Sequence, residues 1–387
     1  QYPHNGGAAT LAYELHNYLQ NNKNICSKCC FFLNKKEDKK INSNIKLLDP
    51  NNYCNICKTK NINDDAEILD NIDCILAINY GIVPKIKEIY KKKIIYIVVG
   101  SPELTLGSEC PNAKNISFNK FINDKEYDLT HMLSTKNHKM NLDSIKNSTF
   151  TIINSPNTRK IYERLFPNYI HKFKNFYTFE SFVFIKKYNI TNNISYNNHN
   201  KEFDLITISS SWTRTVKNPK LVFNIFNKYK NLKKIIIGNN IDKTGYSFNN
   251  TENTKIMKGL PNNLIIDYLS KSKILLLPSY YEAGGIIILE ALKCGCKVIT
   301  STNVGLHYLL PEKYLCNDVY DINEWVSNID KILSVDKINY NIPTYENIDL
   351  IKDIFKIKTK QKKQNQKKWT REMLLKELDK FNNNKTE

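Results

Sequence analysis

The chain has 387 residues, of which 41% are hydrophobic, and it carries a formal net charge of +19. This length has room for two domains of ordinary size, with enough apolar residues for real cores. No run of about 18 or more apolar residues occurs, which argues against a membrane-spanning helix, and no secretory signal is visible. The charge suits anionic partners, but a sequence this rich in Asn, Lys and Ile equally indicates a compositional lysine excess.

The first half alternates helix-like and strand-like segments, as an α/β protein does. A helix is predicted at 10–19, directly after Gly6 and Gly7. A crossover helix is predicted at 83–90, with Pro84 in its first turn. Strands are predicted at 29–33, 74–78, 94–99 and 151–153.

Two polar or cysteine-bearing stretches of this half bear on function. The stretch 124–143 is predicted to be a mobile loop, whose His131 and His138 are solvated rather than catalytic. Two Cys-x-x-Cys pairs, at 26–29 and 54–57, have a spacing near that of a zinc ribbon. The first pair also reads as part of a strand, where small buried thiols are common, and this second interpretation is favoured.

The alternation restarts after an asparagine-rich stretch at 187–201, which is predicted to be a linker. A lysine- and glutamine-rich segment at 356–368 precedes a predicted amphipathic helix at 369–381. Strands are predicted at 205–209, 235–237, 274–277 and 298–300, and helices at 221–232, 263–271, 285–294 and 323–333. Two such halves indicate two Rossmann-like domains.

The most informative segment is 278–300, PSYYEAGGIIILEALKCGCKVIT. Its order of strand, glycine turn, helix and strand places the turn where an α/β sheet binds ligands. Gly284 and Gly285 carry no Cβ, so a phosphate can approach the backbone N–H groups of Gly284, Gly285 and Ile286. Glu290 lies some 6 Å further along the helix axis, at about 1.5 Å per residue, where a carboxylate would accept hydrogen bonds from the two hydroxyls of a ribose.

The same segment resembles the donor-binding signature of the retaining GT-B glycosyltransferases of group 1, or family 4, type. That signature reads roughly P-S-x-x-E-G-F-G-x-x-x-x-E-A-x-A-x-G-x-P-V-I. Ala283 and Gly284 replace its Gly-Phe, and Lys297 replaces its Pro. The matching residues are Glu282, Gly285, Glu290, Ala291, Gly295, Val298 and Ile299.

The resemblance implies the GT-B fold, an α/β architecture of two Rossmann-like, doubly wound parallel-sheet domains facing a cleft. Residues 1–187 would form the acceptor-side domain and residues 188–355 the domain that binds a nucleotide-sugar donor. Residues 356–387 would form a basic tail and a C-terminal helix, which packs on the first domain or touches an anionic membrane. The first strand of the family precedes the Gly6-Gly7 loop, and it is expected to lie upstream of this sequence.

The resemblance also implies roles for individual residues. Glu282 would contact the transferred sugar and Glu290 would hold the ribose. Gly6 and Gly7 would approach the acceptor and the diphosphate. The residues expected at the diphosphate are Gly284, Gly285, Ile286, Lys217 and Arg214.

Two departures from the family concern charged or catalytic positions. The family arginine before Lys217-Asn218 is replaced by Ser211 or Trp212, so Arg214 would supply the charge from a shifted position. No histidine follows the strand at 94–99, where many relatives carry one. Glu103 stands in that region, either as a polar substitute or as an ordinary loop carboxylate.

Three functions follow from this pattern. The favoured one is a metal-independent retaining glycosyltransferase with a glycan, lipid or protein-linked acceptor. It needs no cofactor beyond the nucleotide-sugar co-substrate, and it is expected in the cytoplasm or at the periphery of a membrane. A GT-B-shaped scaffold without turnover is the alternative that the departures suggest. A nucleic-acid binder is suggested by charge alone and lacks a binding motif.

Overall fold

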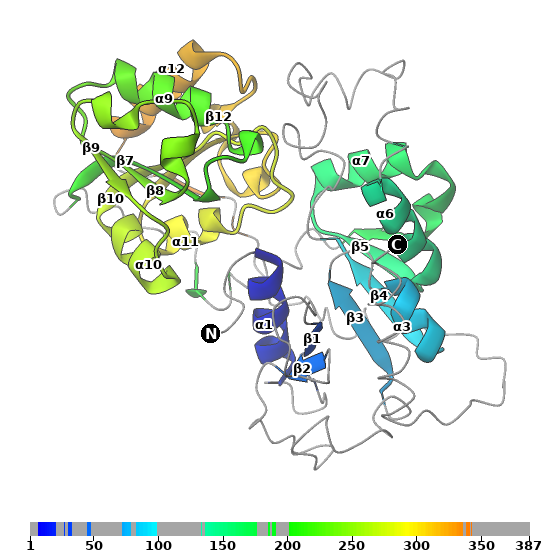
Figure 1. Cartoon of the computed structure of the whole chain (residues 1–387). Coiled ribbons are helices and arrows are strands. Elements are labelled where there is room, and N and C mark those ends of the chain that lie inside the picture. Colours follow the sequence, from blue (N-terminus) through cyan, green and yellow to red (C-terminus); the bar gives the residue numbers. More distant parts are fainter. Residues whose placement is uncertain are drawn as a thin grey trace.

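The computed structural model describes residues 7–20, 27, 30–32, 45–47, 72–78, 83–98, 133, 136–175, 185, 188–190, 201–335, 338–340 and 342. Within these residues the strands form three sheets. Two of them are parallel sheets flanked by helices, one in each half of the chain (Figure 1).

The sheet of the first half has four parallel strands in the order β3-β4-β5-β6. Alternate side chains of β4 face opposite sides of this sheet, as the pleat requires. Ile95 and Ile97 join the buried cluster that includes α1, whereas Ile94 and Tyr96 join the cluster of α3, α6 and α7. The elements are α1 (Gly7–Gln20), β3 (Cys74–Ile78), α3 (Val83–Ile89), β4 (Lys93–Ile97), α6 (Lys136–Asn147), β5 (Phe150–Ile153), α7 (Pro156–Leu165), η4 (Pro167–Lys172) and β6 (Phe173–Asn175).

One expectation for this half is confirmed as a strand but in a different sheet, and one needs correction. The strand predicted at 29–33 is β1 (Cys30–Phe32), which pairs antiparallel with β2 (Ile45–Leu47) in a separate sheet of two strands. The stretch 124–143 is not all loop, because 136–143 belongs to α6. His138 is buried there and its ring stacks on Phe166 with centroids 4.7 Å apart.

The sheet of the second half has six strands in the order β12-β11-β10-β7-β8-β9, and every pair in it is parallel. Helices α9 and α12 cover one face of this sheet, and α10 and α11 cover the other (Figure 1). Its strands are β7 (Phe203–Ser211), β8 (Lys234–Asn239), β9 (Thr254–Met257), β10 (Ser272–Leu277), β11 (Lys297–Ser301) and β12 (Leu315–Cys316). Its helices are α9 (Pro219–Lys228), α10 (Asn262–Ser270), α11 (Ile287–Lys293) and α12 (Ile322–Leu333), and its short 3-10 turns are η6 (Thr215–Lys217), η7 (Ile241–Lys243), η8 (Phe248–Asn250), η9 (His307–Leu309) and η10 (Glu312–Tyr314).

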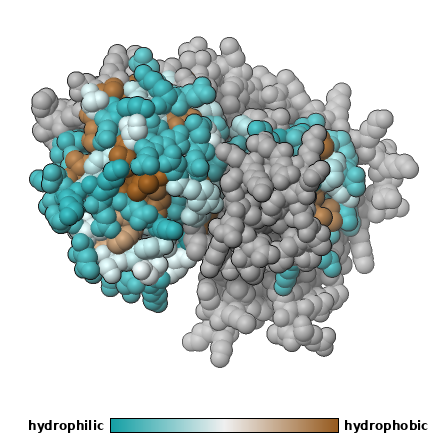
Figure 2. Space-filling model, turned by 90° about the horizontal axis from the view of Figure 1, so that it is seen from above, coloured by the Kyte–Doolittle hydropathy of each residue, from teal (hydrophilic) through white to brown (hydrophobic). Residues whose placement is uncertain are grey.

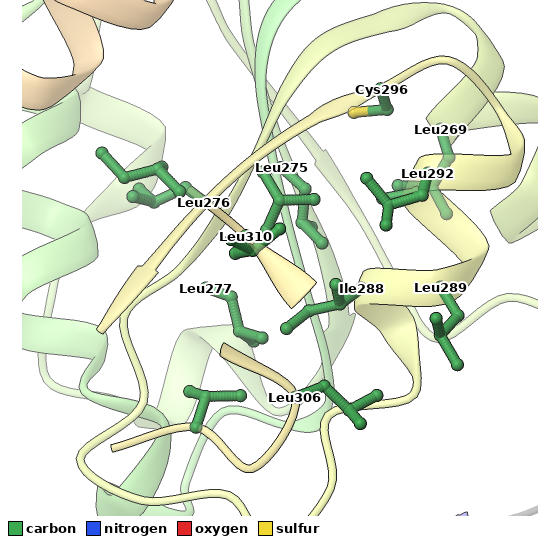
Figure 3. Close-up of a cluster of buried hydrophobic side chains, with 14 of the residues drawn as sticks. Leu269, Leu275, Leu276, Leu277, Ile288, Leu289, Leu292, Cys296, Leu306 and Leu310 are labelled. Carbon is green, nitrogen blue, oxygen red and sulfur yellow. The ribbon is translucent and has the colours of Figure 1, made fainter. Parts of the chain in front are cut away.

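The core of the second half lies between this sheet and its helices. Figure 3 shows β10 and α11 packed together through Leu275, Leu277, Ile288 and Leu292, all of them buried. The surface over α9 and α12, by contrast, is mostly hydrophilic with isolated apolar residues (Figure 2). The apolar packing of Figure 3 therefore fixes the strand and the helix that flank the turn at 278–286.

No helix in the described part of the chain is long and apolar enough to cross a membrane.

Candidate functional site

The topology of the second sheet identifies one edge as the place for a ligand. The sheet grows outward from β7, with β8 and β9 on one side and β10, β11 and β12 on the other. Strands β7 and β10 are therefore neighbours across the point where the strand order reverses. In open parallel sheets, ligands bind beyond the carboxyl ends of the strands at this switch point. The loops that follow β7 and β10 form the candidate site.

These two loops bring Lys217 and Glu282 together. The ammonium Nζ of Lys217 is ion-paired with Oε1 of Glu282, although 65 residues separate them in sequence. The hydroxyl of Ser279 donates to the same carboxylate oxygen at 3.0 Å. The side chains are only 14% and 19% exposed, so water screens the pair less than a surface ion pair. One side of the site therefore holds a positioned cation and a positioned carboxylate.

The backbone after Lys217 explains the residue that follows it. Asn218 has φ 54° and ψ 53°, a left-handed conformation that Asn and Gly tolerate better than other residues. Its side-chain oxygen accepts from the N–H of Leu221 at 3.3 Å and caps α9. The Lys-Asn pair thus ends a 3-10 turn and begins a helix, which fixes the direction in which Lys217 leaves the backbone.

Backbone hydrogen bonds hold the loop of Glu282 against the segment after β11. The N–H of Glu282 donates to the carbonyl of Asn303 at 3.4 Å, and the N–H of Gly305 donates to the carbonyl of Glu282 at 2.8 Å. Glu282 and Val304 form an isolated parallel bridge. The carboxylate is therefore carried on a short strand-like pairing rather than on an unsupported loop.

The glycine turn leaves its amides available. Gly285 has φ 94°, and a Cβ built on it would lie 2.7 Å from Cγ1 of Val304. Helix α11 begins at Ile287, two residues later than the sequence predicted, with Ile286 as its N-terminal cap. Among the residues that the structure describes, none accepts a hydrogen bond from the N–H groups of Gly284, Gly285 or Ile286. These three backbone donors, two to four residues after Glu282, are therefore unpaired among the described residues.

Glu290 lies in the first turn of α11 and is 7% exposed. Its Oε1 accepts from Nδ2 of Asn262 at 2.8 Å and from the hydroxyl of Tyr188 at 3.2 Å. Burial and the carboxylate of Glu290 raise the pKa of Tyr188, so the phenol remains a donor at neutral pH. The carboxylate is thus held at a fixed place, one helical turn from the glycine amides.

The arginine position of the family has a different occupant here. Trp212 is 1% exposed and its Nε1 donates to the carbonyl of Ile237 at 3.0 Å, so it is a core residue. Arg214 is exposed in the turn that precedes η6, and its carbonyl accepts from the N–H of Lys217 at 2.9 Å. Its guanidinium has no ion pair among the described residues. Its placement next to η6 is compatible with the shifted role predicted for it.

The structure describes few of the other predicted residues. Gly7 is the first residue of α1, whereas Gly6, Glu103 and His131 lie outside the described residues. The Cys-x-x-Cys pairs at 26–29 and 54–57 also lie outside them, so the zinc interpretation stays a hypothesis. Within the residues that are described, no group of three or more His, Cys, Asp or Glu side chains is placed to hold a metal ion.

Sequence reasoning missed the side chains that support the site. Asn262 and Tyr188 orient Glu290 from distant segments, and no local pattern singles them out. Ser279 stands in the Pro-Ser start of the signature, which could have suggested its contact with Glu282 three residues later. The resemblance named the charged residues but not the polar side chains that hold them.

The part of the chain that forms this site matches a known protein family. Residues 190–349 match the family of glycosyl transferases group 1, which confirms the resemblance for this part of the chain. The expected α/β architecture, with a parallel sheet flanked by helices in each half of the chain, is confirmed as well.

Several solved glycosyltransferases are similar to about two thirds of the chain. The sucrose-phosphate synthase from Thermosynechococcus elongatus is 14% identical, with a TM-score of 0.47 over 69% of this chain and 66% of that one. A UDP-forming α,α-trehalose-phosphate synthase from Burkholderia xenovorans is 10% identical, with a TM-score of 0.44 over 70% of this chain and 68% of that one. WaaG, a glycosyltransferase involved in lipopolysaccharide biosynthesis, is 14% identical, with a TM-score of 0.37 over 63% of this chain and 70% of that one. No curated protein matches the sequence.

Proposed function

We propose that the chain is a retaining glycosyltransferase that transfers a sugar from a nucleotide-diphosphate donor to a glycan, lipid-linked or protein-linked acceptor. The observation that carries this proposal is the Lys217–Glu282 pair at the switch point between β7 and β10, in a group 1 glycosyltransferase domain. The available amides of Gly284, Gly285 and Ile286 and the fixed carboxylate of Glu290 support it.

In this proposal the donor lies along the carboxyl edge of the sheet. Its diphosphate receives the three amides, the ammonium of Lys217 and the guanidinium of Arg214, and its ribose hydroxyls donate to Glu290. Glu282 accepts hydrogen bonds from hydroxyls of the sugar and keeps the ammonium of Lys217 between itself and the phosphate. Gly6 and Gly7 stay assigned to the acceptor side and the diphosphate.

The reaction needs stabilisation of a leaving group. The bond between the anomeric carbon and the β-phosphate oxygen breaks, and the nucleoside diphosphate leaves with the electron pair. The acceptor hydroxyl oxygen bonds to the same face of the anomeric carbon, and its proton passes to the departing phosphate oxygen. Amides and cations that are fixed before the charge develops stabilise it without reorganisation. The proposal includes no metal and no further cofactor.

A melting-temperature panel tests the donor site. The wild type is heated with UDP, GDP, ADP and their sugars, next to Glu290→Ala and to Glu312→Gln, which alters an exposed carboxylate on η10. We expect one base to raise the melting temperature of the wild type and of Glu312→Gln, but not that of Glu290→Ala. At a ligand concentration of 100 times Kd, the stabilisation is about 2.7 kcal/mol.

The panel also decides between enzyme and scaffold. If no nucleotide stabilises the folded wild type, the transferase proposal is wrong and a GT-B-shaped scaffold takes its place. If a nucleotide binds, transfer from the matching sugar is measured with and without EDTA, and the anomeric configuration of the product is read by NMR. Loss of transfer with EDTA, or an inverted product, would contradict the metal-independent retaining mechanism.

A further inference from the structure

We infer that the first turn of α7, in the other domain, positions Glu282 for the proposed transfer, with Tyr281 and Thr302 as the residues that it holds. Helix α7 follows β5 of the first sheet, whereas Tyr281 and Thr302 follow β10 and β11 of the second. The inference rests on the proposed role of Glu282, but the contacts of α7 with Tyr281 and Thr302 can be tested without any enzyme activity.

The first contact is a buried bond between hydroxyls. The hydroxyl of Thr158 lies 2.7 Å from that of Tyr281, and it also lies 2.8 Å from Oγ of Ser155, the N-terminal cap of α7. Thr158 and Ser155 are fully buried and Tyr281 is 5% exposed. In such surroundings a hydrogen bond is stronger than at the surface. The residue directly before Glu282 is thus fixed to the capped end of a helix of the other domain.

The second contact joins α7 to the segment after β11, which pairs with the backbone of Glu282. Nδ2 of Asn157 donates to the carbonyl of Thr302 at 2.6 Å. The next residue, Asn303, accepts from the N–H of Glu282. Both segments that carry the backbone of Glu282 are therefore held by neighbouring residues of α7.

Apolar packing supports the same junction. Val216, Tyr281 and Ala283 come from the loops after β7 and β10, yet they join the buried cluster of α3, α6 and α7. Val216 precedes Lys217, and Tyr281 and Ala283 flank Glu282. The residues beside both members of the ion pair are thus packed on the first domain, so a change in the contact between the domains must move the pair.

Two variants remove the polar contacts, and Tyr281→Phe does so with little loss of volume or packing. Tyr281→Phe deletes the hydroxyl, and Thr158 keeps Ser155 as a partner. Asn157→Ala removes the bond to Thr302. The matched control is Tyr229→Phe, which deletes another tyrosine hydroxyl, bonded to Asp330 at 2.7 Å on the side of α9 and α12.

Hydrogen exchange followed by mass spectrometry tests the hold directly, in the full-length protein without ligand. We expect peptides that contain the amides of Glu282 and Gly305 to exchange about tenfold faster in Tyr281→Phe and Asn157→Ala than in Tyr229→Phe. Exchange in α11 should not change. Equal exchange in all three variants at residues 279–286 and 302–306 would overturn the inference, whether or not the protein is an enzyme.

Kinetics test the consequence for the reaction. UDP-glucose, GDP-mannose and ADP-glucose are assayed in turn for release of the nucleoside diphosphate. A displacement near 1 Å at a reacting group lowers rates by up to about 100-fold, so we expect Tyr281→Phe to lower kcat by about 10- to 100-fold. Tyr281→Phe should keep the rise in melting temperature that the nucleoside diphosphate causes. The double variant Tyr281→Phe/Thr158→Val should have a kcat no lower than that of the slower single variant, because both changes remove the same hydrogen bond. An unchanged kcat in Tyr281→Phe would overturn the positioning role. A wild type that binds no nucleotide would overturn the proposed function, and the hydrogen-exchange result alone would then decide whether α7 fixes the loop of Glu282.

Discussion

At the scale of single residues, Gly285 is the position where the site depends most on one side chain being absent. Its φ of 94° is rarely adopted by residues with a Cβ, and Val304 occupies the space that a Cβ would need. Gly285 lies in the turn between Glu282 and α11, whose amides are proposed to receive the diphosphate. A larger residue would have to change both the backbone and its packing on Val304.

Gly285→Ala is therefore expected to destabilise the fold and to weaken nucleotide binding. Backbone strain of this kind costs on the order of 1–3 kcal/mol, and the contact with Val304 adds to it. Gly245→Ala is the matched control, because Gly245 has φ 80° but nothing within 4 Å of the added Cβ. Free energies of unfolding from urea titration compare the two variants. If Gly285→Ala costs no more than Gly245→Ala, the contact with Val304 does not contribute.

At the scale of secondary-structure elements, two buried lysines bind the C-terminal carbonyls of two helices. Lys234 is fully buried, and its Nζ donates to the carbonyls of Phe226, at 2.9 Å, and Tyr229, at the C-terminus of α9. Lys297 does the same for the end of α12, through the carbonyls of Ile332 and Val335. Unpaired carbonyls and the negative end of the helix dipole both favour a cation there. Part of the lysine excess is thus structural rather than a surface for anionic partners.

The packing of α6 on α7 makes a pH-dependent prediction. His138 of α6 stacks on Phe166 at the end of α7, and burial lowers its pKa below the ordinary value of 6.5. The folded state then favours the neutral ring, so the unfolded state binds protons more readily as the pH falls. The stability that His138 contributes is present above pH 6.5 and is lost as the pH falls toward its lowered pKa.

His138→Phe keeps a ring on Phe166 but cannot take up a proton. We expect its melting temperature to fall less than that of the wild type between pH 7.5 and pH 5.0. His171→Phe, which alters an exposed histidine of η4, is the control and should follow the wild type. An identical pH dependence in His138→Phe and the wild type would show that His138 does not titrate on unfolding in this range.

At the scale of the whole molecule, long apolar runs predicted the architecture, and short elements escaped prediction. The strands at 205–209, 235–237, 274–277 and 298–300 were identifiable because parallel strands are buried on both faces. Strands β6, β9 and β12 were missed, since they have only 2–4 residues and depend on neighbours for pairing. His138 was misjudged because the burial of a polar stretch depends on what packs over it.

The candidate site was predictable as a set of residues but not as a set of contacts. The signature indicated Glu282 and Glu290, and the Lys-Asn pair indicated Lys217, since each pattern is local in sequence. Their partners are remote: the contact of Tyr281 with Thr158 spans 123 residues, and that of Glu290 with Tyr188 spans 102. The first pair depends on how the two domains pack and the second on how the segment at 188 lies against α11, and one sequence carries no local pattern that specifies either.

The two domains are expected to unfold together, although chains with several domains commonly unfold in separate steps. One buried apolar cluster contains Leu15 of α1 and Ile95 of β4 together with Leu275 of β10. The buried bonds of α7 to Tyr281 and Thr302 cross the same junction. Loss of either domain would expose apolar surface of the other, at about 25 cal/mol per Å², and this penalty couples their unfolding.

Two probes can test this coupling. Trp212 and Trp325 are buried in the second domain, so tryptophan fluorescence of a Trp369→Phe variant reports on that domain. Far-ultraviolet circular dichroism reports on the helices of both domains. We expect the two urea-unfolding midpoints to coincide in the wild type and to separate in Tyr281→Phe/Asn157→Ala, in which the polar contacts of α7 are lost. Separate midpoints already in the wild type would mean that each domain is stable alone, and the shared cluster would then align the domains without stabilising either one.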